Sequence, residues 1–429
     1  MPYKCGTQNK LNRMKRNYAI VVLILITFFV VSFLTNILGA LNPSVSQSFN
    51  LSETMAGFLP FSFFMAYGVM SIPAGFMVQK FGEKKLMIVA FSLAVAGSLL
   101  FAQMPSFGVF LFSLFTIGTG MAVLQVAINP LLRVAGGEEN YAFTSVMAQL
   151  VFGAASFVSP LVYSWLVTSI NGTGAQNSLI NTLSNLVPES MSWVSIYWIF
   201  AMISLVMIFI ILSIPFPKVG LNEDEKVGDK ETYVSLFKNK VVILYFFGIF
   251  AYVGAEQGIS YWMSKFLQIN HGFDYETVGA VAVGNFWGLM TIGGILGLIL
   301  LKVLDSKLVL RLFTVLAIIC LAVALVGSSQ ISLISFQASG FFLSIMYPVI
   351  ISLALNSVKS NHGAVAGILM SGIMGGAVVQ LLIGFISDLT TLKIGMTLVF
   401  VTLAYILSIS FWAKPIVTNK TISLKKSDN

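Results

Sequence analysis

Long apolar segments recur along the whole chain, separated by short polar segments. A helix of about 20 apolar residues crosses the roughly 30 Å hydrocarbon core of a bilayer. Continuous runs of that length are typical of membrane-spanning helices, whereas the strands of a membrane barrel would alternate apolar and polar positions. The pattern predicts twelve spans, at about 18–41, 54–79, 85–103, 106–132, 141–168, 192–216, 241–267, 277–303, 307–327, 329–355, 363–386 and 394–415.

The composition excludes an ordinary soluble protein. Of the 429 residues, 57% are hydrophobic and only 9% are charged, and the mean hydropathy is +0.91. Soluble domains carry roughly a quarter charged residues, so this chain could not cover a water-facing surface. The sequence therefore predicts an all-α membrane protein.

Basic residues collect in the two tails and in every second loop. Of the 24 Lys and Arg residues, all except Lys265 and Lys393 fall on the side that carries both termini. Because basic loops stay in the cytoplasm, this bias predicts cytoplasmic N- and C-termini. It also explains the net charge of +8 without a nucleic-acid partner. The first apolar run is too long for the core of a signal peptide and lacks a clear cleavage site, so it is expected to be the first span.

One long polar segment, residues 217–240, divides the spans six and six. We therefore expect two bundles of six helices joined by a cytoplasmic linker. Such a pair, with a site between the halves at the bilayer midplane, is what an alternating-access carrier needs. The expected organisation is a tail at 1–17, a first bundle at 18–216, a linker at 217–240, a second bundle at 241–415 and a tail at 416–429.

The loop between the second and third spans contains glycines and a basic cluster: Gly75, Lys80, Gly82, Lys84 and Lys85. Glycines allow a tight turn, and the lysines hold the loop at the cytoplasmic face. These features alone fit an ordinary basic cytoplasmic loop as well as they fit a functional motif. At this position among twelve spans, however, its spacing resembles the loop signature of the major facilitator superfamily, which implies a gating role.

Further motifs narrow the resemblance. They are Leu124–Pro130 (LQVAINP), Met147–Gln149 (MAQ), Tyr252–Glu256 (YVGAE), Met346–Pro348 (MYP) and Gly384–Asp388 (GFISD). Together they resemble the fucose–galactose–glucose:proton symporter family, in order through both halves and over nearly all of the chain except the tails. The resemblance implies a major facilitator fold of 12 transmembrane helices in two six-helix bundles. It also implies a monomer in a bacterial inner membrane that takes up a small neutral sugar with a coupling cation.

Glu256 is the only acidic residue that the predicted spans place well inside the membrane. A carboxyl group at that depth is costly and by default marks a functional site or an ion pair. No Lys or Arg lies at comparable depth, and burial disfavours the charged form, so the group can carry a proton. The alternative is a carboxylate that reaches toward the outer surface. We expect Glu256 to couple transport to a cation, with the proton favoured.

Amides and aromatic residues inside the spans are candidates for holding a sugar. Amides both donate and accept hydrogen bonds, and sugar rings pack against apolar surface. Gln125 and Asn129 share one helix face, and Pro130 leaves the carbonyl of Val126 without its helical partner. The alternative role for such amides is hydrogen bonding between helices. The expected substrate-binding residues are Gln125, Asn129, Gln149, Tyr252, Gln257, Asn285, Trp287 and Asn356.

Two further aromatic residues, Tyr347 and Trp262, differ in the position that we expect for them. Tyr347 is an additional candidate for the sugar site. Trp262 lies near the outer end of its span, where an interfacial position is the stronger expectation.

The chain departs from the family pattern at three places. Proton-coupled fucose carriers are expected to have an acidic residue in spans one and four. Here the counterpart in span one is Gly39, with Asn36 the nearest polar residue, and Gln125 stands at the span-four position. An Asn expected in span five is Phe152. These differences argue against L-fucose as the substrate and leave proton coupling to Glu256 alone, with sodium-coupled and uncoupled transport as open alternatives.

Other function classes fit less well. An exporter of the same fold remains an alternative. A non-transporting sensor is disfavoured because the linker and tails are too short for a signalling domain. The sequence contains no helix that pairs His with carboxylates, no nucleophile elbow and no phosphate-binding loop, so we expect no enzyme. No metal or cofactor is expected.

Overall fold

The computed structural model describes residues 18–136, 141–172, 177–216 and 230–416, and these are almost entirely helical. Twelve helices are long and apolar enough to cross a membrane, which confirms the predicted number of spans and the all-α membrane fold. They are Tyr18–Ser48, Glu53–Phe81, Glu83–Gln103, Phe107–Gly136, Phe143–Ile170, Ser192–Ser213, Lys240–His271, Tyr275–Val303, Ser306–Val326, Ser329–Leu355, His362–Leu389 and Leu392–Trp412.

Most spans are continuous helices, and four are broken. The unbroken ones are α3 (Glu53–Phe81), α4 (Glu83–Gln103), α5 (Phe107–Gly136), α6 (Tyr141–Ile170), α8 (Ser195–Ser213), α10 (Lys240–His271), α11 (Ala280–Val303) and α12 (Ser306–Val326). The broken ones are α1 (Tyr18–Thr35) with α2 (Leu38–Ser48), α13 (Ser329–Leu343) with α14 (Met346–Leu355), α15 (His362–Ser371) with α16 (Gly375–Leu389), and α17 (Leu392–Gly395) with α18 (Leu398–Trp412). Breaks inside membrane spans are tolerated only where neighbouring protein satisfies the freed backbone groups.

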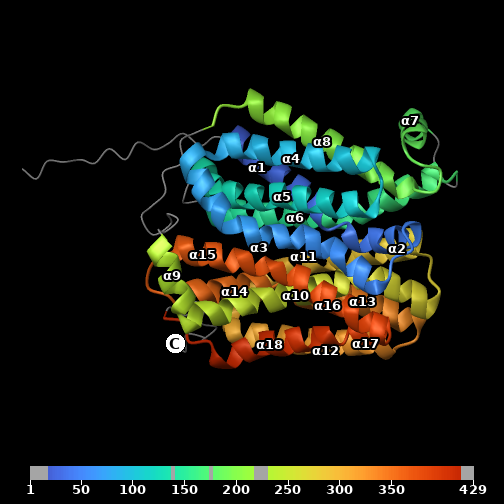
Figure 1. Ribbon diagram of the computed structural model, residues 1–429. Coiled ribbons are helices and arrows are strands. Elements are labelled where there is room, and N and C mark those ends of the chain that lie inside the picture. Colours follow the sequence, from blue (N-terminus) through green and yellow to red (C-terminus); the bar gives the residue numbers. More distant parts are fainter. Residues whose placement is uncertain (1–17, 137–140, 173–176, 217–229, 417–429) are drawn as a thin grey trace, which may run out of the picture.

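The helices form two bundles, which lie one above the other in Figure 1. The N half consists of α1–α8 and the C half of α10–α18. In the N half α5 packs against α3 and α4, and α1 packs against α6; in the C half α10 packs against α16 and α18, and α12 against α13. The halves meet where α3 contacts α16, α6 contacts α11 and α2 contacts α10. This pseudo-symmetric pairing is the arrangement expected from the six-and-six division.

The bundle has two ends, the terminal end and the distal end. The terminal end carries Tyr18 and Trp412, and it lies on the left in Figure 1. The distal end, on the right, carries the turn between α2 and α3. Of the predicted linker, residues 217–229 lie outside the described residues, and Lys230–Lys238 form the short helix α9 at the terminal end. The predicted tails at 1–17 and 417–429 also lie outside the described residues.

The first span is longer than the sequence predicts because α2 follows α1 after a break at Asn36 and Ile37. The polar residues Asn42, Ser44 and Ser46 lower the hydropathy of this segment, but the structure buries all three. Since α2 contacts α10 of the other half, these side chains face protein rather than lipid. Hydropathy alone therefore ends the span too early. A short helix between the fifth and sixth spans, α7 (Ser178–Leu186), is a further element that the pattern does not predict.

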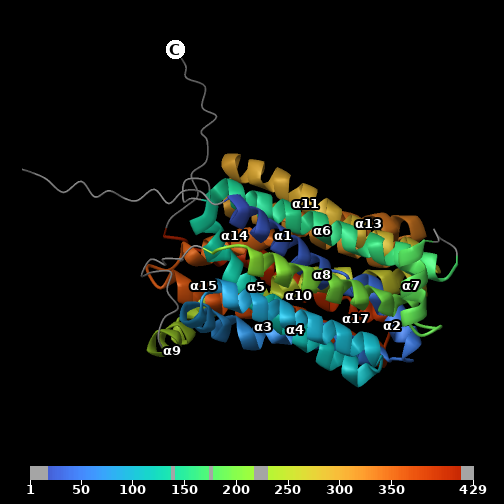
Figure 2. The same ribbon diagram turned by 90° about the horizontal axis from the view of Figure 1, so that it is seen from above.

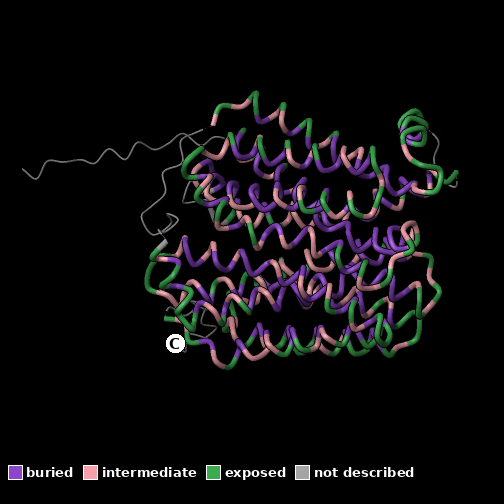
Figure 3. Tube along the Cα trace, viewed as in Figure 1, coloured by how far each residue is buried: buried purple, intermediate pink, exposed green. Residues whose placement is uncertain are grey.

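The outer surface of the bundle is apolar. Figure 3 shows exposed positions along the helices as well as at their ends. They include large hydrophobic side chains such as Phe112, Phe209, Val401 and Phe411, each more than 60% exposed. A surface of this kind suits contact with lipid tails and not with water.

Candidate substrate-binding and coupling site

Glu256 lies at the middle of α10, a helix of 32 residues. The Gln257 side chain donates from Nε2 to Glu256 Oε1 at 3.3 Å, and the Tyr252 hydroxyl, one turn earlier, lies close to the carboxyl group. Tyr252 and Gln257 are buried, and Glu256 is half-buried. Within the described residues no Lys or Arg is paired with Glu256, since the ion pair of α10 is made by Lys265 near its distal end. The carboxyl group is therefore held by neutral hydrogen-bonding groups at mid-span.

Tyr347 joins this group from the tenth span. Its ring centroid lies 5.7 Å from that of Tyr252, and its hydroxyl donates to Met370 Sδ at 3.2 Å. Tyr347 follows directly after the break between α13 and α14. The structure thus brings together Tyr252, Glu256, Gln257 and Tyr347, as the sequence motifs of spans seven and ten suggest.

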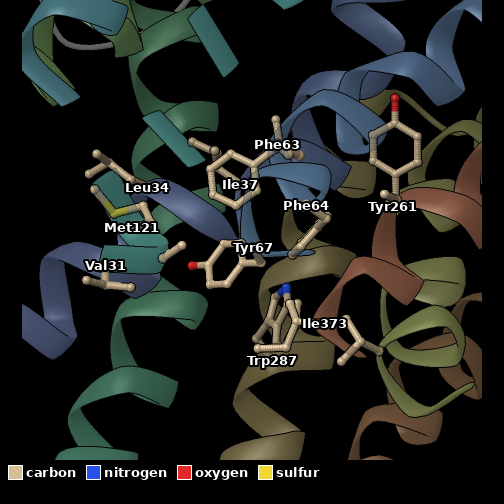
Figure 4. Close-up of a cluster of buried hydrophobic side chains, with 14 of the residues drawn as sticks. Val31, Leu34, Ile37, Phe63, Phe64, Tyr67, Met121, Tyr261, Trp287 and Ile373 are labelled. Atoms are coloured by element: carbon tan, nitrogen blue, oxygen red, sulfur yellow. The ribbon is translucent and has the colours of Figure 1, made fainter. Parts of the chain in front are cut away.

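Trp287 on α11 is buried, and its indole Nε1 has no hydrogen-bond partner in the described part of the chain. Figure 4 shows Trp287 in one cluster with Phe64, Tyr67 and Ile373, where helices of both halves meet. The Tyr67 hydroxyl is similarly buried, but Thr35 lies beside it. A buried donor without a partner costs roughly 1–3 kcal/mol. Trp287 is therefore a donor that a polar ligand between the halves could satisfy.

Tyr67 is the residue of this cluster that the sequence analysis missed. It is a single tyrosine within the apolar run of span two, which also supplies Phe63 and Phe64. Neither its spacing nor a neighbouring polar residue distinguishes it from an ordinary core aromatic.

The predicted amides of the N half lie on α5 and α6. Gln125 is half-buried, and Asn129 and Gln149 are exposed in the structure. The Asn129 side chain donates from Nδ2 to the backbone oxygen of Gln125 at 2.9 Å, which fits the predicted common face. Among the described residues no hydrogen bond joins these amides to the Glu256 group. The two sets of polar residues belong to opposite halves, so a ligand that contacts both would bridge the halves.

Asn285 is not brought to this group. It lies two residues before Trp287 on α11, a rotation of about 200° around the helix. Asn285 Nδ2 donates to Gln337 Oε1 at 3.3 Å, and both line a cavity of about 300 Å³. Its wall also includes Phe157 of the N half and Ile292, a side chain that is 51% exposed. Asn285 therefore faces the outside of the bundle, while Trp287 faces its interior.

Asn356 is also separate from the central group. It caps α14 at the terminal end, where its backbone oxygen accepts from the Ile416 amide at 2.7 Å. Its side chain donates to Ser352 Oγ at 3.4 Å. These contacts give Asn356 a role at a helix end and not at mid-span.

Trp262 differs from its expected interfacial position. The side chain is fully buried, and the ammonium group of Lys265 lies 5.9 Å from its ring centroid. The neighbouring ring of Tyr261 packs against it edge to face at 5.0 Å. Trp262 therefore lies inside the protein beside Tyr261 and Lys265 and not at a lipid interface.

The basic loop between the second and third spans packs within the N half. Gly82 joins α3 to α4 with φ +81°, a conformation that favours glycine, whereas Gly75 is buried within α3. Lys84 Nζ donates to the backbone oxygens of Leu212 at 3.1 Å and Ile214 at 2.8 Å, at the C-terminal end of α8. Lys80 and Lys85 are exposed. In this arrangement Lys84 links α4 to α8, and the gating role of the loop remains a prediction.

We expect Lys84→Met to lower stability by about 1–2 kcal/mol, because two carbonyl groups at a helix C-terminus lose a charged donor. Thermal unfolding of the purified protein in detergent measures this effect. Lys85→Met is the matched control, since Lys85 is the exposed neighbour. An equal loss of stability in both variants would show that general loop charge, and not the contact with α8, stabilises the fold.

Comparison with known proteins shows the family. Residues 24–379 match the family model described as the Major Facilitator Superfamily. The chain belongs to this superfamily. Its relatives include a glucose/galactose transporter of Brucella abortus, 30% identical over 91% of this chain and 93% of the relative. The L-fucose-proton symporter of Escherichia coli is 26% identical over 84% of this chain and 85% of the relative.

Solved structures agree with the major facilitator fold. A crystal structure of the Escherichia coli fucose:proton symporter superposes with a TM-score of 0.66 at 23% identity, covering 92% of this chain and 98% of that one. The two-bundle fold and the family resemblance indicated by the sequence motifs are therefore confirmed. Homologues and fold are those of transporters and not of enzymes.

Proposed function

We propose that this major facilitator protein takes up a neutral hexose by alternating access, with Glu256 carrying the coupling proton. The observation that carries the proposal is the carboxyl group at the middle of α10, held by Tyr252 and Gln257 with no basic partner in the described residues. Such a group can exchange a proton without breaking an ion pair. Ionisable residues inside membrane spans commonly serve in proton relays.

The uncharged polar and aromatic side chains of the two halves favour a neutral sugar as the substrate. Gln125 and Gln149 on the N half offer donors and acceptors, and Tyr252 and Tyr347 on the C half offer aromatic faces. Trp287 adds an unpaired donor. Among the described side chains, no Lys or Arg forms a hydrogen bond or an ion pair with these residues. The name of the Brucella abortus relative, glucose/galactose transporter, points to the same substrate class.

The packing at Gly39 favours a hexose over L-fucose. A Cβ atom at this position would lie 2.1 Å from the backbone oxygen of Ser260 and 3.2 Å from Tyr261 Cα. This arrangement leaves no room for the acidic side chain that fucose carriers of the family are expected to have there. The coupling carboxyl group of this protein is then Glu256 alone.

The orientation that we propose places the terminal end in the cytoplasm of a bacterial cell. The charge bias supports it, since Lys265 and Lys393 are the basic residues on the distal side. Under this orientation the distal end faces the outside, and sugar enters between the halves from there.

The test is sugar-driven pH change in proteoliposomes, with radiolabelled uptake measured in parallel. Glucose, galactose, L-fucose and N-acetylglucosamine are compared. We expect glucose or galactose to acidify the lumen as it enters. Equilibration of the label without proton movement would overturn proton coupling, and stimulation by a sodium gradient would identify sodium in its place. Transport that runs only outward would support an exporter instead.

A further inference from the structure

The two halves are joined by polar contacts at the distal end. Several hydrogen bonds that involve side chains join the halves there. Each bond runs from donor to acceptor: Asn42 Nδ2 to the backbone oxygen of Tyr261, the Tyr261 hydroxyl to the backbone oxygen of Ala56, Lys265 Nζ to Ser46 Oγ, the Tyr275 hydroxyl to Gln47 Oε1, Asn171 Nδ2 to Glu276 Oε2, and the backbone amides of Glu53 and Thr54 to the Asp388 carboxylate. We call this contact the distal seam.

An ion pair lies within the distal seam. Lys265 Nζ of α10 is 2.6 Å from Glu53 Oε2 in the first turn of α3, and the two side chains are 8% and 20% exposed. Lys265 also donates to Ser46 Oγ at 3.1 Å. Removing one partner of a largely buried pair leaves the other charge without compensation, which is strongly unfavourable. The closed seam therefore depends on both charges.

Asp388 makes a second charged contact across the seam. Its Oδ1 accepts from the Glu53 amide at 2.8 Å, and its Oδ2 accepts from the Thr54 amide at 2.9 Å. These amides belong to the first turn of α3, where backbone donors lack helical partners and the helix dipole favours negative charge. A carboxylate at the end of α16 thus caps a helix of the other half. This is a structural role for the last residue of the Gly384–Asp388 motif.

Glycines let the two halves touch along their backbones at this seam. A Cβ atom at Gly384 would lie 2.3 Å from the Glu53 oxygen, and one at Gly57 would lie 3.0 Å from the Gln380 oxygen. Gly39 is in the same relation to Ser260. Packed contacts of this closeness do not stretch gradually, so the seam is either closed or open.

The terminal end has a different kind of contact. There α3 meets α15, and the ring of Phe76 on α3 packs on Tyr233 of α9 with centroids 5.9 Å apart. This contact is aromatic, whereas the Lys265–Glu53 contact of the distal seam is charged.

We infer that the Lys265–Glu53 pair and the Asp388 cap of α3 form an electrostatic latch that determines how often the distal end is open. This inference rests on the alternating access of the proposed function. Both contacts must break when the distal end opens, and both form again when it closes. The latch therefore sets the fraction of protein that can accept sugar from the distal side.

Distances between the halves test the latch without any sugar. Spin labels at Ser106→Cys and Gln330→Cys, exposed positions in distal turns of the N and C halves, report the distance by double electron–electron resonance. Native cysteines are first replaced by serine. Lys265→Met and Asp388→Asn are each expected to raise the ratio of long to short distances about tenfold, which corresponds to about 1.4 kcal/mol. Lys393→Met is the control because it removes an exposed charge at the same end.

A charge exchange separates the latch from a general loss of folding. The double variant Lys265→Glu with Glu53→Lys is expected to restore the short distance. Gly39→Ala provides an independent route, since its methyl group would press on the Ser260 oxygen and favour the long distance. Each variant must elute as a monodisperse protein.

Unchanged distances in both Lys265→Met and Asp388→Asn, or no recovery in the charge-exchanged protein, would overturn the latch. Because the measurement uses no substrate, its outcome is independent of which sugar is carried. Shifted distances with no sugar transport would retain the latch and reject the proposed function.

Discussion

Glu256→Gln is expected to abolish uphill sugar accumulation while the carrier continues to exchange sugar across the membrane. One proton moving through 100 mV provides about 2.3 kcal/mol, enough for about 50-fold accumulation. Gln keeps the size of the side chain and its hydrogen-bonding groups toward Tyr252 and Gln257, but it cannot carry a proton at this site. Accumulation should therefore fall to the equilibrium level, with exchange of labelled sugar within about threefold of wild type.

The measurement compares uptake against a gradient with counterflow in the same proteoliposomes. Glu189→Gln is the control, since it removes an exposed carboxylate that belongs neither to the Glu256 group nor to the distal seam. Sugar-driven pH change that persists in Glu256→Gln would assign Glu256 a structural role. Loss of exchange as well as accumulation would indicate that Glu256 contacts the sugar itself.

The fold was predictable because the bilayer constrains both the length and the composition of each span. Residues 241–264 carry no charge other than that of Glu256, and this is enough to place α10 across the membrane and Glu256 near its middle. The basic loops predict which end of the bundle is cytoplasmic. The error at the first span has a physical cause, since the polar residues of α2 face the other half and not lipid.

The seam between the halves could not be predicted in the same way. Lys265 and Glu53 come from different halves, and each alone resembles a charge near a membrane surface. The available signal was that Lys265 is one of the rare basic residues on the distal side. Its partner is set by the docking of α10 on α2 and α3, for which the sequence holds no local pattern.

The rotation of α11 about its own axis could not be predicted from the sequence either. Asn285 and Trp287 both lie within the eighth span, so both were expected near the sugar. The side of α11 that faces lipid depends on its packing against α6 and α13. Hydropathy does not separate these faces, since apolar residues cover all of them.

The rotation of α11 leads to the last prediction. Trp287→Phe keeps an aromatic ring and removes only the Nε1 donor that lacks a partner in the described residues. If a sugar hydroxyl accepts from this donor, the loss of one hydrogen bond of about 1–1.5 kcal/mol weakens sugar binding about five- to tenfold. Asn285→Leu is expected to leave sugar affinity within about twofold, because Asn285 pairs with Gln337 on the outer side of the helix.

Calorimetric titration of the purified variants with the transported sugar compares these two positions on one helix. If Asn285→Leu weakened sugar binding and Trp287→Phe left it unchanged, the sugar would bind in the cavity lined by Asn285 and Gln337. That result would reject the central site. Equal losses in both variants would point to a change in helix packing, which thermal unfolding of each variant would reveal. The expected contrast follows from geometry alone, since two positions separated by about 200° on a helix cannot line the same side of it.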